Sequence, residues 1–454
     1  MAFLVGLLFL GQCFWIIRRM VVDAIRKDVE LLSVRNMFLL GFLNFVSASA
    51  TTSLLLGDYG LMTLDSPGLT GLLMFVLSCA FLFLLLHHWR RSRIADRISR
   101  YGFRERIVSN IGLIATAWAI IGVGFLCRFP LAVIPFFGIV TSIIAAGMFN
   151  AAVAIGAWAW MRQPLNPVFG LNFLGLLLAC SILLLAGAFG RREVLGLLIS
   201  VAFAAYWARF RFSDTAGLIV RVAIVAALAF VPMVLFTAVR GEDRGERSGT
   251  QFLSAFASVS PSQFAEAGQE LLSGQMAASN SLWLIEHMGD THPYDFLHSL
   301  RYMVEKPIPR KYYPGKTDGL GHTIISDAGI YGYGDSFTIG PGIIGHVWND
   351  FPLVALFLYP WLLGIYLGTL DRLIQRYPND ACMVAICTAG IGHVIGMPRG
   401  DLGNFASNAI FGVIGAFIAL QVVSRLFGRS KIRSRKTLEP WKEWRGLPYG
   451  RASR

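Results

Sequence analysis

The chain has 454 residues, of which 55% are hydrophobic and only 15% are charged, and its mean hydropathy is +0.59. Soluble domains carry roughly 25% charged residues, so the composition excludes an ordinary soluble protein. The net charge of +13 is not a nucleic-acid signal, because the segment 425–454 alone holds ten Lys and Arg against two Glu, a net +8. We interpret that segment as a basic cytoplasmic tail.

Eleven apolar stretches approach the roughly 20 residues that a helix needs to cross a bilayer. They are 2–17, 34–56, 68–86, 107–126, 131–160, 168–189, 194–210, 218–239, 351–371, 381–397 and 404–424. The sequence therefore predicts an all-α, polytopic integral membrane protein with about 11 transmembrane helices.

The basic residues of the loops predict which side of the membrane each loop occupies. Residues 18–35 carry five Lys or Arg and residues 87–106 carry seven, whereas 57–67 carry none. Because basic loops stay in the cytoplasm, we expect the N-terminus outside and the tail inside. This predicts four parts, namely an N-terminal bundle of about eight spans (1–239), a large periplasmic loop (240–345), three C-terminal spans (346–424) and the tail (425–454).

The periplasmic loop, here called the insert, begins with a polar linker and continues with moderately apolar helical patterning over 250–288. We expect amphipathic helices there that lie over the spans. The histidines His287, His292 and His298 match no metal-ligand spacing, and we interpret them as exposed loop residues. Six cysteines without a CxxC pair suggest neither a metal nor a redox cofactor.

A basic, proline-rich run spans 306–316. Its prolines predict an extended, stiff backbone that presents Lys306, Arg310, Lys311 and Lys316 with Tyr312 and Tyr313 between them. Cations beside aromatic rings suit an anionic, sugar-bearing ligand. A solvated basic loop is the alternative that the residues leave open.

After a glycine-rich stretch without any nucleotide-binding pattern, Pro341 opens a predicted helix that continues toward the span near Phe351. Its N-terminus favours a bound anion, and His346, one turn inside and near Asp350, suits a general base. The next outward turn, 397–401, offers a further cation, Arg399, and a helix cap, Asp401.

Pro307-Ile308-Pro309-Arg310, Pro314, Lys316 and the run 337–345, followed by a span ending at Asp371-Arg372, resemble the C-terminal third of the O-antigen and exopolysaccharide repeat-unit polymerases. The resemblance covers roughly residues 280–425. Many members of that family carry an acidic residue where this chain has His346 and a glycine where it has Pro352.

The resemblance implies an enzyme similar to the class C glycosyltransferases, which are all-helical and have outward-facing sites. It would join undecaprenyl-diphosphate-linked oligosaccharides at the periplasmic face of a bacterial inner (cytoplasmic) membrane, without a metal or another cofactor. Its implied partners are the lipid-linked oligosaccharide, the lipid bilayer, and a chain-length regulator and flippase of the same pathway; no nucleic acid is expected.

The expected site divides into two groups. The catalytic candidates are His346, Arg310, Arg399 and Asp401. The substrate-binding candidates are Arg301, Lys306, Lys311, Lys316, Tyr312, Tyr313, Asp335 and Asp350. In this hypothesis Arg310, Lys316 and Arg399 stabilise the diphosphate of the donor, and His346, or else Asp350, Asp335 or Asp401, takes the proton of the acceptor hydroxyl.

Three other functions compete with a polymerase. An O-antigen ligase shares the body plan. A glycolipid transporter or flippase would need cations that line a path through the spans, whereas here they cluster at the membrane mouths. A non-catalytic assembly scaffold would tolerate the loss of single cations.

Overall fold

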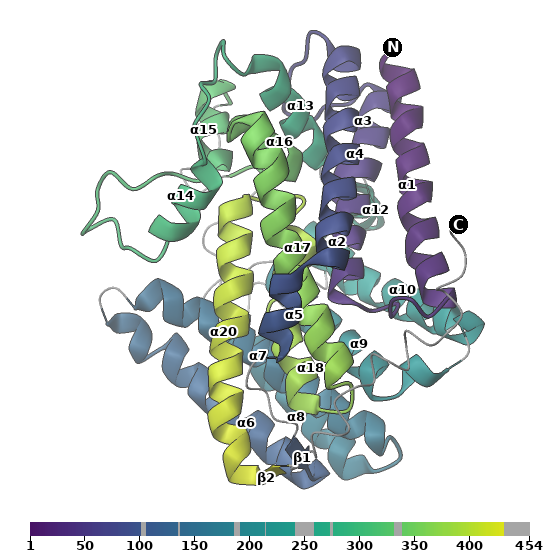
Figure 1. Cartoon of the computed structure of the whole chain (residues 1–454), viewed down its shortest axis with the longest axis vertical. Helices are drawn as coiled ribbons and strands as arrows, with labels where there is room; N and C mark the ends of the chain where they lie inside the picture. Colours follow the sequence, from purple (N-terminus) through teal and green to yellow (C-terminus); the bar gives the residue numbers. More distant parts are fainter. Residues whose placement is uncertain are drawn as a thin grey trace.

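The structure is a computed structural model that describes residues 1–100, 106–134, 137–185, 191–213, 215–240, 258–272, 276–330 and 338–430. These residues form long helices that pack side by side, with shorter helices gathered at one end (Figure 1). The helices before the insert are α1 (Ala2–Ile25), α2 (Val34–Phe42), the π-helix η1 (Leu43–Ala48), α3 (Ser49–Leu56), α4 (Pro67–Arg91), α5 (Arg93–Arg100), α6 (Asn110–Arg128), the 3-10 helix η2 (Leu131–Val133), α7 (Gly138–Arg162), α8 (Pro167–Leu185), α9 (Arg191–Ala208), the 3-10 helix η3 (Phe210–Phe212) and α10 (Thr215–Arg240).

The insert and the C-terminal part supply the remaining elements. They are α12 (Pro261–Leu272), α13 (Ala277–His287), α14 (His298–Glu305), α15 (Leu320–Asp327), α16 (Gly342–Asn349), α17 (Pro352–Arg376), α18 (Ala381–Thr388), α19 (Ile391–Gly396) and α20 (Leu402–Phe427). Two three-residue strands, β1 (Arg106–Val108) and β2 (Gly428–Ser430), pair antiparallel. Figure 1 shows α13 to α16 together at one end, which we call the insert end.

The fold confirms a polytopic α-helical membrane protein. Eight helices are long and apolar enough to span a bilayer, and the shorter apolar helices Leu195–Ala208 and Ala381–Gly396 coincide with two further predicted stretches. Helix α10 covers the remaining one. The count of about eleven spans stays a prediction.

Local sequence signals set many of the helix ends. The side chains of Ser33 and Ser109 accept hydrogen bonds from backbone N–H groups two positions inside α2 and α6, and Asp380 does so at α18. These contacts satisfy donors that a helix leaves unpaired in its first turn. Pro67 and Pro352 begin α4 and α17, because a first-turn residue needs no N–H.

Helix α7 is the centre of the bundle. All its residues from Gly147 to Ala159 are buried, and it packs against α6, α8, α9, α18 and α20. Glycine permits the closest of these approaches, since a Cβ added to Gly147 would lie 2.7 Å from the Cα of Gly412 on α20. Small residues that let helix backbones meet are typical of membrane bundles.

A buried polar cluster joins four helices at the end opposite the insert. Asp371 of α17 accepts the backbone N–H groups of Val34 (2.6 Å) and Arg35 (3.1 Å) and the indole N–H of Trp89 (2.9 Å). Arg35 is fully buried and pairs with Asp23 of α1 at 2.9 Å. Each buried charge is therefore compensated, which low-dielectric surroundings require.

Two expectations about the insert are wrong. The first is an amphipathic surface helix over the end of 250–288, because Ala277 to Ile285 of α13 are all buried. The second is a continuous helix from Pro341 into the span near 351. Helix α16 ends at Asn349, and Phe351 has a positive φ of 75°. The proline at 352 explains this break, since it disfavours a helical conformation in the residue before it.

The insert packs on α20 through one glycine. A Cβ added to Gly403 would lie 2.4 Å from the carbonyl oxygen of Ser299 on α14. We expect Gly403→Ala to push α14 away from α20 and to lower the free energy of unfolding by about 1–3 kcal/mol, as overpacking does. Thermal unfolding of the purified protein in detergent measures the effect. Gly122→Ala on α6, which would meet nothing within 4 Å, is the control, and equal stability of the two variants would contradict the packing argument.

Candidate active site

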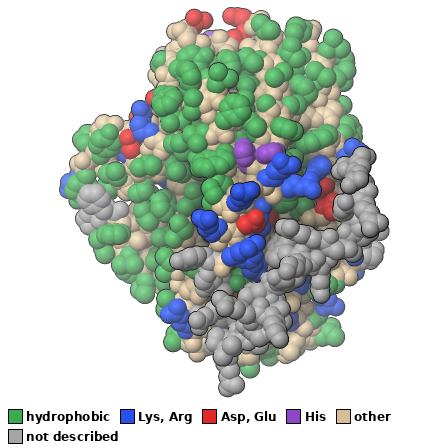
Figure 2. Space-filling view, in the orientation of Figure 1, with side chains coloured by type: hydrophobic (Ala, Val, Ile, Leu, Met, Phe, Trp, Pro, Cys, Tyr) green, Lys and Arg blue, Asp and Glu red, His purple; other side chains and the backbone are tan. Residues whose placement is uncertain are grey.

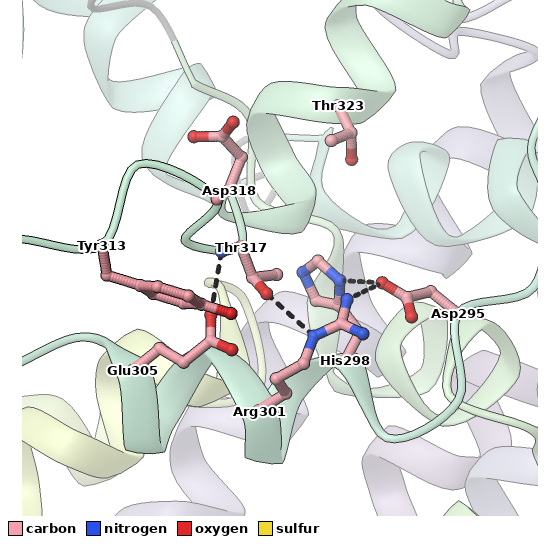
Figure 3. A pocket seen from close by; sticks show the side chains of 9 residues that line it. Asp295, His298, Arg301, Glu305, Tyr313, Thr317, Asp318 and Thr323 are labelled. Carbon is pink, nitrogen blue, oxygen red and sulfur yellow. Dashed lines mark hydrogen bonds and ion pairs between the residues drawn. The ribbon is translucent and has the colours of Figure 1, made fainter. Parts of the chain in front are cut away.

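A polar pocket of about 390 Å3 lies in the insert, between α14, the loop that follows it and α15. Its lining residues are Asp295, His298, Arg301, Glu305, Tyr313, Gly315, Thr317, Asp318 and Thr323 (Figure 3). Both charge signs and an aromatic ring therefore face one cavity. Of the residues predicted from the sequence, Arg301 and Tyr313 line it.

The pocket contains a carboxylate that holds a histidine and an arginine. Oδ2 of Asp295 accepts a hydrogen bond from Nδ1 of His298 (2.7 Å) and one from Nη2 of Arg301 (2.5 Å). Figure 3 shows both side chains directed at this carboxylate. Because an ionised carboxylate only accepts, the His298 proton sits on Nδ1 and Nε2 keeps its lone pair. Among the described residues Nε2 has no partner, although it is shielded from solvent.

The loop after α14 is folded into turns. Backbone N–H groups of Tyr312 and Tyr313 both bond to the carbonyl oxygen of Pro309, and that of Lys316 bonds to Tyr313. The expected extended backbone is therefore wrong. Proline fixes φ, but its φ is compatible with turns as well as with extended chain.

Two of the predicted substrate cations hold this loop together. Nζ of Lys316 donates to the carbonyl oxygens of Lys306 (2.8 Å) and Ile308 (3.0 Å). Burial, and then the nearby charge of Arg310, lowers the pKa of Lys316 below its usual value. Lys306 donates to the side-chain amides of Asn404 and Asn408 on α20. Both lysines thus have structural partners.

Other predicted residues remain exposed at the tip of the loop. Arg310 is 56% exposed and pairs with Asp318, a pocket residue. Lys311, Tyr312 and Tyr313 are exposed beside it. A cation and aromatic rings are therefore accessible at the rim of the pocket.

His346 and Asp350 lie beneath the pocket and are fully buried. Nε2 of His346 accepts the backbone N–H of Leu402 (3.0 Å), so its proton is on Nδ1, which donates to Oγ of Ser299 (2.7 Å). Asp350 accepts the backbone N–H of Ser299 (2.8 Å) and the hydroxyl of Tyr359. Both ring nitrogens of His346 are occupied, so the structure places it in a supporting position and not against a substrate.

The turn 397–401 contributes structural contacts as well. Asp401 caps α20 through the N–H of Asn404 (3.0 Å), which confirms its predicted role as a helix cap, and also accepts the N–H of Leu320 at the start of α15 (2.9 Å). The guanidinium of Arg399 lies over the ring of Phe45, 5.9 Å from its centroid. Neither residue lines the pocket. Asp335 lies outside the described residues.

The sequence interpretation missed His298 and its partner Asp295. The expectation of exposed loop histidines is wrong for His298 and for His292, which are 4% and 5% exposed. A usable signal was present, because Asp295, His298 and Arg301 follow one another at intervals of three, and three-residue spacing places helical side chains on one face. The described residues contain no group of three or more His, Cys, Asp or Glu that could hold a metal ion.

Comparisons with known proteins add no relative. No protein-family model, no curated protein and no solved structure matches the chain.

The buried position of His346 makes stability depend on pH. Burial lowers its pKa, and the opposing effects of Asp401 and Asp350 are smaller. The unfolded chain therefore takes up this proton at a higher pH than the folded protein, so stability is lost as pH falls below about 6.5 toward the lower folded pKa. His346→Gln keeps an acceptor for Leu402 but does not titrate. We expect its unfolding temperature to fall less than that of wild type between about pH 7.5 and about pH 5, and parallel curves would contradict this.

Proposed function

We propose that the protein is a membrane glycosyltransferase that joins lipid-diphosphate-linked glycan repeats, a polysaccharide polymerase acting at the insert end. The observation that carries the proposal is the Asp295–His298–Arg301 arrangement in a polar pocket whose rim exposes Arg310. It combines a histidine whose free nitrogen can accept a proton with cations that can neutralise a leaving diphosphate. The motifs shared with the repeat-unit polymerases supply the substrate class.

The mechanism we infer uses two lipid-linked substrates. Nε2 of His298 takes the proton of an acceptor sugar hydroxyl, whose oxygen attacks the anomeric carbon of the donor glycan. The bond between that carbon and the diphosphate oxygen breaks, and the lipid diphosphate leaves. Asp295 stabilises the imidazolium that forms, and Arg301 and Arg310 stabilise the charge on the diphosphate.

Other predicted residues act as positioning residues in this mechanism. His346 and Asp350 fix Ser299, which adjoins His298 at the start of α14. Lys306 and Lys316 fix the loop that carries Arg310. Proximity of two membrane-held substrates adds to the rate.

Arg301 provides the genetic test. In a deletion strain complemented with variants, we expect Arg301→Ala to reduce the ladder of surface glycan to single repeats and to accumulate lipid-linked single repeats. Gel analysis of surface glycan and of lipid-linked intermediates measures both. Arg128→Ala, at the end of α6 and outside the pocket lining, should restore the full ladder. Accumulation of lipid-linked polymer would indicate a ligase instead, and an unchanged ladder in the deletion strain would refute a polymerase.

His298 provides the kinetic test. We expect His298→Gln to lower the polymerisation rate of the purified protein on lipid-linked repeats by about 10²–10⁴-fold, the usual contribution of a general base. The matched control is His322→Gln, an exposed histidine of α15. A rate for His298→Gln within a few-fold of the control would remove His298 from the mechanism while leaving the Arg301 test intact.

A further inference from the structure

Helix α5 has three different faces. Ala95 and Ser99 are buried against α17, where the Arg376 guanidinium donates to the carbonyl oxygen of Ser99 (2.8 Å). A second face exposes Ile94 and Ile98, which are 47% and 44% exposed. The helical repeat places the remaining arginines on a third face.

That third face is strongly cationic. Its arginines, Arg93, Arg97 and Arg100, are all exposed, and none of them forms an ion pair with a described residue. The acidic residue of the helix, Asp96, is used by Arg372 of α17 at 2.6 Å. Figure 2 shows Lys and Arg side chains gathered in the middle of one face, in the region where Figure 1 places α5, with hydrophobic side chains bordering them.

The position of α5 relative to the spans is fixed. It follows the C-terminal end of α4 and packs on the C-terminal end of α17, and both helices are candidate spans. Arg372 ties this corner together, since its Nη2 also donates to the carbonyl oxygens of Trp89 (2.9 Å) and Arg90 (3.0 Å). Helix α5 therefore lies where two spans leave the hydrocarbon, at the end opposite the insert.

We propose that α5 is an interfacial helix that binds the phosphates of anionic phospholipids in the leaflet opposite the insert. Exposed isoleucines beside arginines are unfavourable in water but match the boundary between acyl chains and headgroups. Arginine forks bond phosphate oxygens in pairs, and a negative lipid surface attracts each added cation. A plain topology signal would need the charges but neither the exposed isoleucine pair nor the rigid attachment to α17.

Lipid titration of the full-length protein in detergent tests this site. Phosphatidylglycerol should raise the unfolding temperature in a concentration-dependent manner, and phosphatidylcholine should raise it less. Arg93→Gln/Arg97→Gln/Arg100→Gln should weaken the apparent affinity for phosphatidylglycerol by on the order of tenfold or more. The corresponding triple Lys variant, which keeps the charge, should retain most of it, and Ile94→Ser/Ile98→Ser should lose part of it.

A charge-matched control distinguishes a defined site from a general attraction. Arg18→Gln/Arg26→Gln/Lys27→Gln removes three exposed cations from the C-terminal part of α1 and the residues that follow it and should bind phosphatidylglycerol like wild type. Equal losses in this control and in the α5 variant would overturn the proposal. So would a wild-type protein that does not distinguish the two lipids, whatever the variants do.

Discussion

Polar groups inside an apolar bundle have to find their hydrogen-bond partners within the protein, and this requirement determines how the insert meets the spans. His346 lies at the centre of that contact. One ring nitrogen holds the start of α20 through Leu402, and the other holds Ser299 at the start of α14. Asp350 adds a second bond to Ser299. The pocket is built on α14, so its position depends on this buried chain.

The cations of the insert divide by their partners. Lys306 and Lys316 spend their hydrogen bonds on amide and carbonyl oxygens, which orders the loop. Arg301 and Arg310 pair with carboxylates at the pocket and stay about half exposed. An arginine in such an exposed pair can change its partner at little cost, because surface ion pairs contribute little free energy. This makes the two arginines better suited than the lysines to meet an anionic substrate.

The sequence predicted the features that depend on neighbouring residues. The apolar stretches, the cap at Asp401 and the helix start at Pro352 are local, and the structure has them. The partners of Lys306 on α20 are 98 and 102 residues away, and no spacing rule reaches that far. Burial of His298 is likewise a tertiary property, so its polar surroundings in the sequence suggested an exposed loop. The seven arginines of 87–106 predicted the side of the membrane, but not that part of that segment forms a helix with three faces.

The contact between His346 and Leu402 has a consequence for biosynthesis. Chains are made from the N-terminus, so the residues of the pocket are translated well before α20. Helix α14 then lacks one of the two elements that hold it, since both Gly403 and Leu402 belong to α20. The site therefore assembles only after the last long helix has joined the bundle, and a nascent chain that stops short of it carries every pocket residue without a formed pocket.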